Sequence, residues 1–241
     1  MELQHSHDWN LSREEAIALQ QSLRDKIITT DQLGEVRTVA GVDVGFEDGG
    51  DTTRAAIVVL SFPDLQIQER AIAHRPTTFP YIPGLLSFRE VPAVLDALDQ
   101  LQHLPDLLLC DGQGTAHPRR LGIACHVGLL TNLPAIGVAK SLLVGQHETV
   151  SDEKGAWQPL KHQGEVIGVA LRTRSKTKPL YISPGHRISL ETSIAYVLQC
   201  TPKYRLPETT RQAHKLASET PASELENLNV EKREESQLRL F

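Results

Sequence analysis

Apolar and polar positions in the first third of the chain follow a pattern that is typical of β-strands. Residues 36–46, 55–61 and 65–73 are rich in β-branched and other apolar side chains, and polar or glycine-rich turns separate them. The connections over 47–51 and at Phe62-Pro63-Asp64 are short. Three strands joined by short turns predict an antiparallel meander.

The pattern changes after residue 87. Apolar residues at helical spacing cover 88–102, and residues 107–110 are all apolar. A continuous apolar run of this length is typical of a parallel strand that is covered on both faces. A helix over 121–130 and an apolar strand over 135–139 repeat the order. The sequence therefore predicts the α/β class, with a mixed sheet of an antiparallel three-strand meander plus parallel strands, flanked by helices.

The remaining segments complete this outline. Ser12 and Glu15 have capping-box spacing ahead of a predicted N-terminal helix. Strands are expected over 166–171 and 180–183, and helices over 190–198 and 207–217, whereas the polar segment 148–163 is expected to be a loop. We expect a single domain over 1–218, followed by a flexible charged tail over 219–241.

The composition is that of a globular protein. Hydrophobic residues make up 40% of the chain, yet no apolar run approaches the ~18 residues that a membrane span needs. The first residues lack the charged start and apolar stretch of a secretory signal. Cys110, Cys125 and Cys200 show no CxxC spacing, so they are expected to be buried thiols. A cytoplasmic location is the expectation.

The net charge of −5 hides an uneven distribution. Residues 219–241 hold six glutamates and three basic residues, a local charge of −3, which leaves −2 for the rest of the chain. Four cations occur at alternate positions: Arg172, Arg174, Lys176 and Lys178. On an extended backbone they would point in one direction, as suits a phosphate backbone. A solvated loop is the alternative interpretation.

Three acidic residues occur where a fold seldom requires a charge. Asp43 interrupts an apolar strand, and the strand period places Gly41 and Gly45 on its face, which leaves room for a cation and a phosphate. Asp111 ends the apolar strand 107–110 ahead of a glycine-rich loop, and Glu90 lies in the first turn of a predicted helix. Taken singly, each has an ordinary alternative role as a salt-bridge partner, a turn residue or a helix-start charge. Taken together, they predict a Mg²⁺ site, because Mg²⁺ binds carboxylate oxygens and can activate water beside a phosphodiester.

Two further side chains are candidates for the same chemistry. His214, on the last predicted helix, could orient water or hold a metal, or could be an ordinary surface histidine. Lys140 follows the apolar strand 135–139, where it is either a phosphate-binding cation or a solvated strand end.

Residues Pro80-Tyr81-Ile82-Pro83-Gly84 form an unusual stretch. Two prolines stiffen a loop that presents an aromatic ring and a branched aliphatic side chain. One interpretation is a packed turn over the core. The other is a wedge that enters a base stack and takes the place of a displaced base.

Several motifs together resemble the endonuclease V family. The similarity is collinear from about Val39 to Ala217 and is most specific in the segment from Pro80 to Glu90. The other matching motifs are Val39-Ala40-Gly41-Val42-Asp43-Val44, Asp111-Gly112-Gln113-Gly114, His117-Pro118-Arg119 and Gly137-Val138-Ala139-Lys140.

The resemblance implies a ribonuclease H-like fold and hydrolysis of the second phosphodiester bond 3′ to a deoxyinosine. It implies Mg²⁺ as the cofactor, with Mn²⁺ able to substitute. By motif position, it makes Asp43, Glu90 and Asp111 the metal ligands, with His214 and Lys140 in the active site. Tyr81 becomes the wedge, and the base pocket forms around Gly112, His117 and Gly122.

Other partners and substrates stay open at this stage. Four residues near the end resemble a motif that binds the bacterial sliding clamp: Gln237, Leu238, Leu240 and Phe241. The alternative is that this segment packs on the protein's own core. Inosine-containing RNA and branched or mismatched DNA are alternative substrates, and a non-catalytic lesion-binding module is an alternative function. We expect a monomer.

Overall fold

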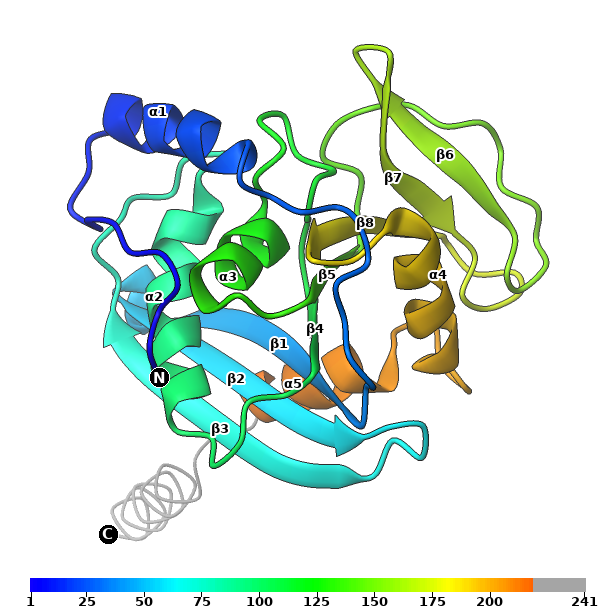
Figure 1. Ribbon diagram of the computed structural model, residues 1–241, viewed down its shortest axis with the longest axis horizontal. Helices are drawn as coiled ribbons and strands as arrows, with labels where there is room; N and C mark the ends of the chain where they lie inside the picture. The colour runs from blue at the N-terminus through cyan, green and yellow to red at the C-terminus, as the bar shows by residue number, and fades with distance from the viewer. Residues whose placement is uncertain (219–241) are drawn as a thin grey trace, which may run out of the picture.

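The computed structural model describes residues 1–218. Its centre is an eight-stranded sheet with the order β3-β2-β1-β4-β5-β8-β7-β6 (Figure 1). The strands are β1 (Thr38–Glu47), β2 (Thr52–Ser61), β3 (Ile67–Pro76), β4 (Leu107–Cys110), β5 (Ala135–Ala139), β6 (Trp157–His162), β7 (Glu165–Leu171) and β8 (Leu180–His186). The helices are α1 (Arg13–Arg24), α2 (Leu86–Asp99), α3 (Ile123–Thr131), α4 (Leu190–Gln199) and α5 (Glu208–Ser218), with a short 3₁₀ turn, η1 (Asp48–Gly50).

The predicted mixed sheet is confirmed. Strands β3, β2 and β1 form the antiparallel meander, and β1, β4 and β5 pair in parallel. Strand β4 is buried along its whole length, as its continuous apolar run predicted. The tail residues 219–241, with the clamp-like motif, lie outside the described residues, so the predicted domain boundary stays a prediction.

Two layers of helices cover the two faces of the sheet. Alternate residues of β4 enter different cores: Leu108 packs with side chains of α2 and α3, whereas Leu107 and Leu109 pack with Val197 of α4 and Ala213 of α5. The strand period therefore decides which helix each side chain of β1 and β4 meets. The residues beside β4 that carry charge lie where this layered core ends.

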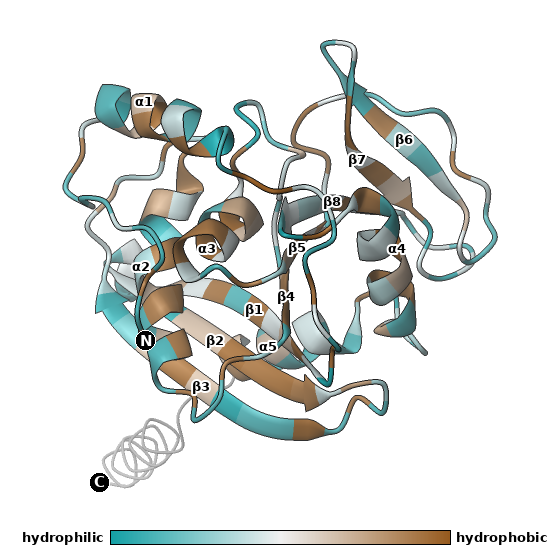
Figure 2. Cartoon of the chain, in the orientation of Figure 1, coloured by the Kyte–Doolittle hydropathy of each residue, from teal (hydrophilic) through white to brown (hydrophobic). Residues whose placement is uncertain are grey.

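The segment expected to be a loop, 148–163, contains a strand, and that prediction was wrong. Strand β6 pairs with β7 in an antiparallel hairpin, with a register shift at Leu160. It is an edge strand in which Leu160 is buried and Trp157 is exposed, and Figure 2 shows it as largely hydrophilic. Because one apolar side chain is enough to anchor an edge strand, its sequence lacks the pattern of a core strand.

The predicted row of cations is also absent from the structure. Arg172 is buried, and its guanidinium donates hydrogen bonds to the carbonyl oxygens of Ser151 and Val150 at 3.0 and 2.8 Å. Lys176 has a φ of +58°, so the backbone turns there and does not continue as a strand. The alternation therefore reflects a turn and one structural arginine.

The three cysteines are free and buried, as their scattered positions predicted. Within residues 1–218, no helix combines the length and hydrophobicity needed to cross a membrane.

Candidate functional site

Helix α5 approaches β1 without a side chain between them at Gly41. A Cβ at Gly41 would lie 2.0 Å from the carbonyl oxygen of Thr209, so only glycine permits this contact. The open face expected beside Asp43 is therefore filled by α5 at Gly41, and it stays open at Gly45. The close packing brings His214 to Asp43, with 3.3 Å between Nδ1 and Oδ2.

Asp43 and Asp111 meet because β1 and β4 are parallel neighbours. The backbone N–H of Asp111 donates to the carbonyl oxygen of Val42 at 2.9 Å, which extends the strand pairing by one residue. Asp43, Asp111 and His214 each offer one ligand atom, and these atoms lie within 4.8 Å of one another. The ammonium group of Lys140 forms an ion pair with Asp111.

Glu90 of α2 lies close enough to these carboxylates to be affected by their charge. Burial, together with the charges of Asp111 and Asp43, raises the pKa of Glu90 to about 8. Burial and the contact with Asp111 raise the pKa of Asp43 to about 6, against the opposing effect of Lys140 and His214. Three carboxyl groups held together in this way favour a bound cation. Carboxylate oxygens with one imidazole nitrogen fit a divalent ion such as Mg²⁺ or Mn²⁺.

A pocket of ≈ 190 Å³ opens beside these acids. Eight predicted site residues line it: Tyr81, Pro83, Gly84, Glu90, Asp111, Gly112, His117 and Gly122. Six further residues line it that the sequence did not single out: Leu86, Ser87, Gln113, Leu121, Ile123 and Leu143. Leu86 and Ser87 could have been found, because they stand inside the family-specific motif. Leu143 gave no signal.

The predicted wedge loop divides between the pocket and the core. The ring of Tyr81 is 68% exposed at the pocket rim. Ile82 packs against a buried group that includes Phe79 and Leu85, and Pro80 faces a separate hollow near Trp9. One side chain of the loop is therefore free to meet a partner, while its neighbour anchors the loop.

Hydrogen bonds fix the wedge loop to the wall of the pocket. The carbonyl oxygen of Gly84 accepts from His117 Nε2 at 3.0 Å, from Arg119 Nη2 at 2.6 Å and from Gln20 Nε2 at 3.0 Å. His117 Nδ1 in turn accepts from the backbone N–H of Arg119 at 3.2 Å. Burial, with the nearby charge of Arg119, lowers the pKa of His117 to about 4, so its ring is neutral.

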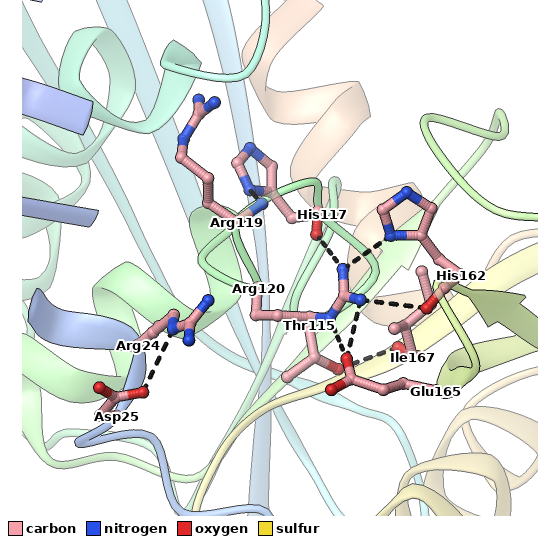
Figure 3. A network of polar contacts seen from close by, with 9 residues as sticks. All are labelled: Arg24, Asp25, Thr115, His117, Arg119, Arg120, His162, Glu165 and Ile167. Carbon is pink, nitrogen blue, oxygen red and sulfur yellow. Dashed lines mark hydrogen bonds and ion pairs between the residues drawn. The ribbon is translucent and has the colours of Figure 1, made fainter. Parts of the chain in front are cut away.

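Arg120 ties the same wall to the β6–β7 hairpin (Figure 3). Its guanidinium donates to the carbonyl oxygens of His117 and His162 at 2.9 and 3.3 Å and pairs with Glu165 at 2.8 Å. Thr115 Oγ1 donates to the carbonyl oxygen of Ile167 at 3.0 Å (Figure 3). The hairpin that the sequence failed to predict therefore supports the loop that carries His117.

Close backbone packing shapes the opposite side of the pocket. A Cβ at Gly122 would lie 2.2 Å from the carbonyl oxygen of Gln113, and the Gly122 N–H donates to Gly114 at 3.0 Å. Gly122 is also the N-cap of α3. A larger residue at this position would push the loop that follows Asp111 away from the helix.

Comparison with known proteins identifies the family to which this chain is similar. The family model for endonuclease V matches residues 21–215. Endonuclease V of Trichormus variabilis is 64% identical over 219 residues, which cover 90% of this chain and 99% of the relative. Endonuclease V of Roseiflexus castenholzii is 57% identical over 213 residues, 88% of this chain and 95% of the relative.

Solved structures agree with the sequence relatives. The crystal structure of endonuclease V from Streptomyces avermitilis has a TM-score of 0.83 and 45% identity, covering 87% of this chain and 92% of that chain. A complex of Ciona intestinalis endonuclease V with DNA containing an inosine followed by a ribo-adenosine has a TM-score of 0.76 and 30% identity. The similarity covers 90% of this chain and 100% of that chain. The predicted ribonuclease H-like mixed sheet is thereby confirmed, and the chain belongs to the endonuclease V family of nucleases.

Proposed function

We propose that this protein is a Mg²⁺-dependent DNA repair endonuclease that nicks DNA at the second phosphodiester bond 3′ to deoxyinosine and related deaminated bases. Asp43, Glu90 and Asp111 are here called the acid cluster. The observation that carries the proposal is the pocket of ≈ 190 Å³, which is lined by two members of this cluster, Glu90 and Asp111. A base held in this pocket places its own strand beside the carboxylates. The inosine-containing DNA bound by the Ciona relative supports this substrate.

The carboxylates supply the binding site for the cofactor. Asp43 and Asp111 would hold Mg²⁺, with Glu90 and His214 completing the site, and Mn²⁺ would fit the same oxygen and nitrogen donors. When bound, the ion polarises the phosphodiester and lowers the pKa of a coordinated water. Lys140, held beside Asp111, places its positive charge near the same phosphate.

The exposed ring of Tyr81 and the pocket walls would select the base. Extruding a base costs a few kcal/mol, and a weakly paired deaminated base costs least. Tyr81 would fill the vacated space in the stack, while Pro80, Ile82, Pro83 and Gly84 hold its loop in place. Gly112, His117 and Gly122 would shape the pocket around the extruded base.

The experiment is a nicking assay with purified protein on a duplex that carries one deoxyinosine. Cleavage is expected with Mg²⁺, with a product that maps to the second phosphodiester 3′ to the inosine, and none is expected with EDTA. The same duplex with adenine in place of inosine is the control. Equal cleavage of both duplexes, or cleavage in EDTA, would contradict the proposal. An inosine-containing RNA in parallel tests the ribose alternative, because the DNA in the Ciona complex carries a ribo-adenosine after the inosine.

We propose in addition that Gln237, Leu238, Leu240 and Phe241 bind the bacterial sliding clamp, that the enzyme is a monomer and that it acts in the cytoplasm. The support for clamp binding is the sequence motif, in which apolar side chains follow a charged segment. A chain truncated after Asn229 is expected to lose clamp affinity and to keep its nicking activity. Unchanged clamp binding would refute this role.

A further inference from the structure

A chain of three polar side chains leads from the pocket to the N-terminal segment. Ser87, which lines the pocket, lies 3.0 Å from Nδ1 of His126, measured from its Oγ. Nε2 of His126 lies 2.8 Å from Nε2 of His7, and Nδ1 of His7 lies 2.7 Å from the carbonyl oxygen of Asp8. Trp9 and Phe88 pack their rings around the two imidazoles, at 5.5 and 5.1 Å from His126.

The carbonyl of Asp8, at the end of this series of hydrogen bonds, determines which atom donates in each of them. The carbonyl oxygen of Asp8 can only accept, so Nδ1 of His7 carries the proton. Burial lowers the pKa of His7 and so favours the neutral ring, in which Nε2 is a bare acceptor for His126. Burial also lowers the pKa of His126 to about 3, so this ring is neutral and carries its single proton on Nε2.

The same reasoning then fixes the hydroxyl group of Ser87. Because Nδ1 of His126 is a bare acceptor, the hydroxyl hydrogen of Ser87 is committed to it. The oxygen of Ser87 retains its lone pairs and has no hydrogen left to donate. Toward the pocket, Ser87 is therefore an acceptor of hydrogen bonds.

We propose that Ser87 is a specificity-determining residue that accepts a hydrogen bond from the ring N–H on the Watson–Crick edge of the extruded base. This inference rests on the proposed function. Deamination of adenine to hypoxanthine converts the bare ring N1 into N1–H, and deamination of cytosine to uracil converts bare N3 into N3–H. Ser87 thus matches the ring nitrogen of the deaminated bases and opposes a lone pair in adenine or cytosine.

The carbonyl oxygen of Gly84, another residue of the motif that lines the pocket, is already in use. The oxygen of Gly84 accepts from His117, Arg119 and Gln20, so its acceptor capacity is taken up by the protein itself. Ser87 lies three residues along, one helical turn before Glu90, and both residues line the same pocket. One turn of α2 thus carries both Ser87, which would contact the base, and Glu90 of the acid cluster.

The test compares Ser87→Ala with the unaltered enzyme on two bases, each placed opposite an abasic site so that base pairing does not contribute. Deoxyinosine offers N1–H, and deoxynebularine, the purine without O6, offers a bare N1. Ser87→Ala is expected to lower kcat/KM for deoxyinosine by about tenfold, mainly through KM, because one hydrogen bond is lost. For deoxynebularine kcat/KM is expected to stay the same or to rise. An equal loss on both bases, or an unchanged ratio, would overturn the proposal.

A second variant, at a residue outside the pocket, tests the donor and acceptor order of these hydrogen bonds. His7→Phe keeps an aromatic ring beside Trp9 but removes the acceptor for Nε2–H of His126. His126 can then carry its proton on Nδ1 and donate to Ser87, whose hydroxyl hydrogen turns toward the pocket. The preference for deoxyinosine over deoxynebularine is expected to fall although Ser87 is intact. An unchanged preference would refute the role of His7 as a positioning residue.

Two comparisons distinguish a failure of this proposal from a failure of the proposed function, and a specific effect of Ser87 from a general effect of losing a buried serine. Ser193→Ala removes another buried helix serine, one that donates to the carbonyl of Ser189 at 2.7 Å, and it should leave the ratio of the two bases unchanged. If the unaltered enzyme fails to prefer deoxyinosine over deoxyadenosine, the proposed function fails. If that preference holds and survives Ser87→Ala, only the inference about Ser87 fails.

Discussion

Helix α2 takes part in two clusters of buried polar groups that differ in where their partners lie. Around Glu90, the acid cluster brings together carboxyl groups whose mutual repulsion and burial raise the pKa values of Glu90 and Asp43. One turn earlier, Ser87 reaches His126, both of whose ring nitrogens have partners within the chain. The first cluster concentrates acidic groups, whereas the second pairs each ring nitrogen of His126 with a hydrogen-bonding group.

The difference teaches how to interpret a shifted pKa in this molecule. Both clusters hold strongly perturbed groups, yet the shift of His126 comes from burial beside partners that suit its neutral form. The shifts of Glu90 and Asp43 include repulsion between like charges, which folding alone would not select. Buried groups of like charge that are held together mark the place where we expect a ligand to contribute. Four substitutions test this contrast.

The largest effect is expected for Asp43→Asn. The change removes a charged ligand atom from the group formed with Asp111 and His214, so nicking is expected to fall by about 10³-fold or more. The fold should remain, because a repulsive charge is removed. Asp96→Asn is the matched control, since Asp96 is an exposed carboxylate of α2 that pairs with Arg75. Single-turnover nicking measures the rates. Full activity of Asp43→Asn would contradict the proposed role of Asp43 in the site.

Tyr81→Ala tests the exposed aromatic residue at the pocket. The loss of base stacking is expected to weaken binding of an inosine-containing duplex by about 1–3 kcal/mol. The nicking rate of the saturated enzyme should change little. Tyr204→Ala serves as the control, because this exposed ring already stacks against Arg211 at 4.8 Å. Equal affinities of Tyr81→Ala and unaltered enzyme would remove Tyr81 from the site.

Glu90→Gln sharpens the contrast through stability. Burial first, and then the charges of Asp111 and Asp43, raise the pKa of Glu90 to about 8. Metal-free Glu90 must therefore take up a proton on folding at pH 7, and an amide of the same shape avoids that cost. The melting temperature is expected to rise, by roughly 2–4 °C for each kcal/mol recovered in a chain of this size. Added Mg²⁺ should stabilise the unaltered protein more than the variant. A lower melting temperature of metal-free Glu90→Gln would show that the acid cluster does not strain the fold.

The smallest effect concerns pH and the cluster of Ser87 and His126. The pKa of His126 is lowered to about 3 in the folded protein, so the unfolded chain binds the proton first as pH falls below 6.5. Stability is therefore full above pH 6.5 and is lost progressively toward pH 3. His126→Leu should reduce the slope of unfolding free energy against pH by about 1.4 kcal/mol per pH unit between pH 6 and 4. A slope remains from His186 and His117, because burial lowers the pKa of each to about 4. Urea titrations across this range measure it, and an unaltered slope would refute the assignment.

The sequence predicted the elements that obey a strong period. The meander and the parallel strands β4 and β5 were predicted correctly. Both faces of β2, β4 and β5 are buried, so their side chains had to be apolar, whereas the edge strand β3 buries Ala71 and Ala73 alone. Strand β6 was not predicted, because it is an edge strand with one buried apolar residue. Its signal was the turn at Gln163-Gly164, where both residues have positive φ, as in a tight hairpin.

The candidate site was predictable in its acids and less so in its walls. Asp43 and Asp111 interrupt or end apolar strands, and such charges stand out against their surroundings. Arg120 and His126 carried no such mark, because their importance depends on partners brought close by tertiary packing. The expected open space at Gly41 was wrong for the same reason, since the strand period does not show which helix will cover a glycine.

The contact between His214 and Asp43 joins positions that are 171 residues apart. A polypeptide emerging from the ribosome carries the carboxylate long before it carries the imidazole. Helix α5, which seats on Gly41, is the final helix of the described residues. A chain that ends before α5 therefore lacks the imidazole that lies beside Asp43 and Asp111.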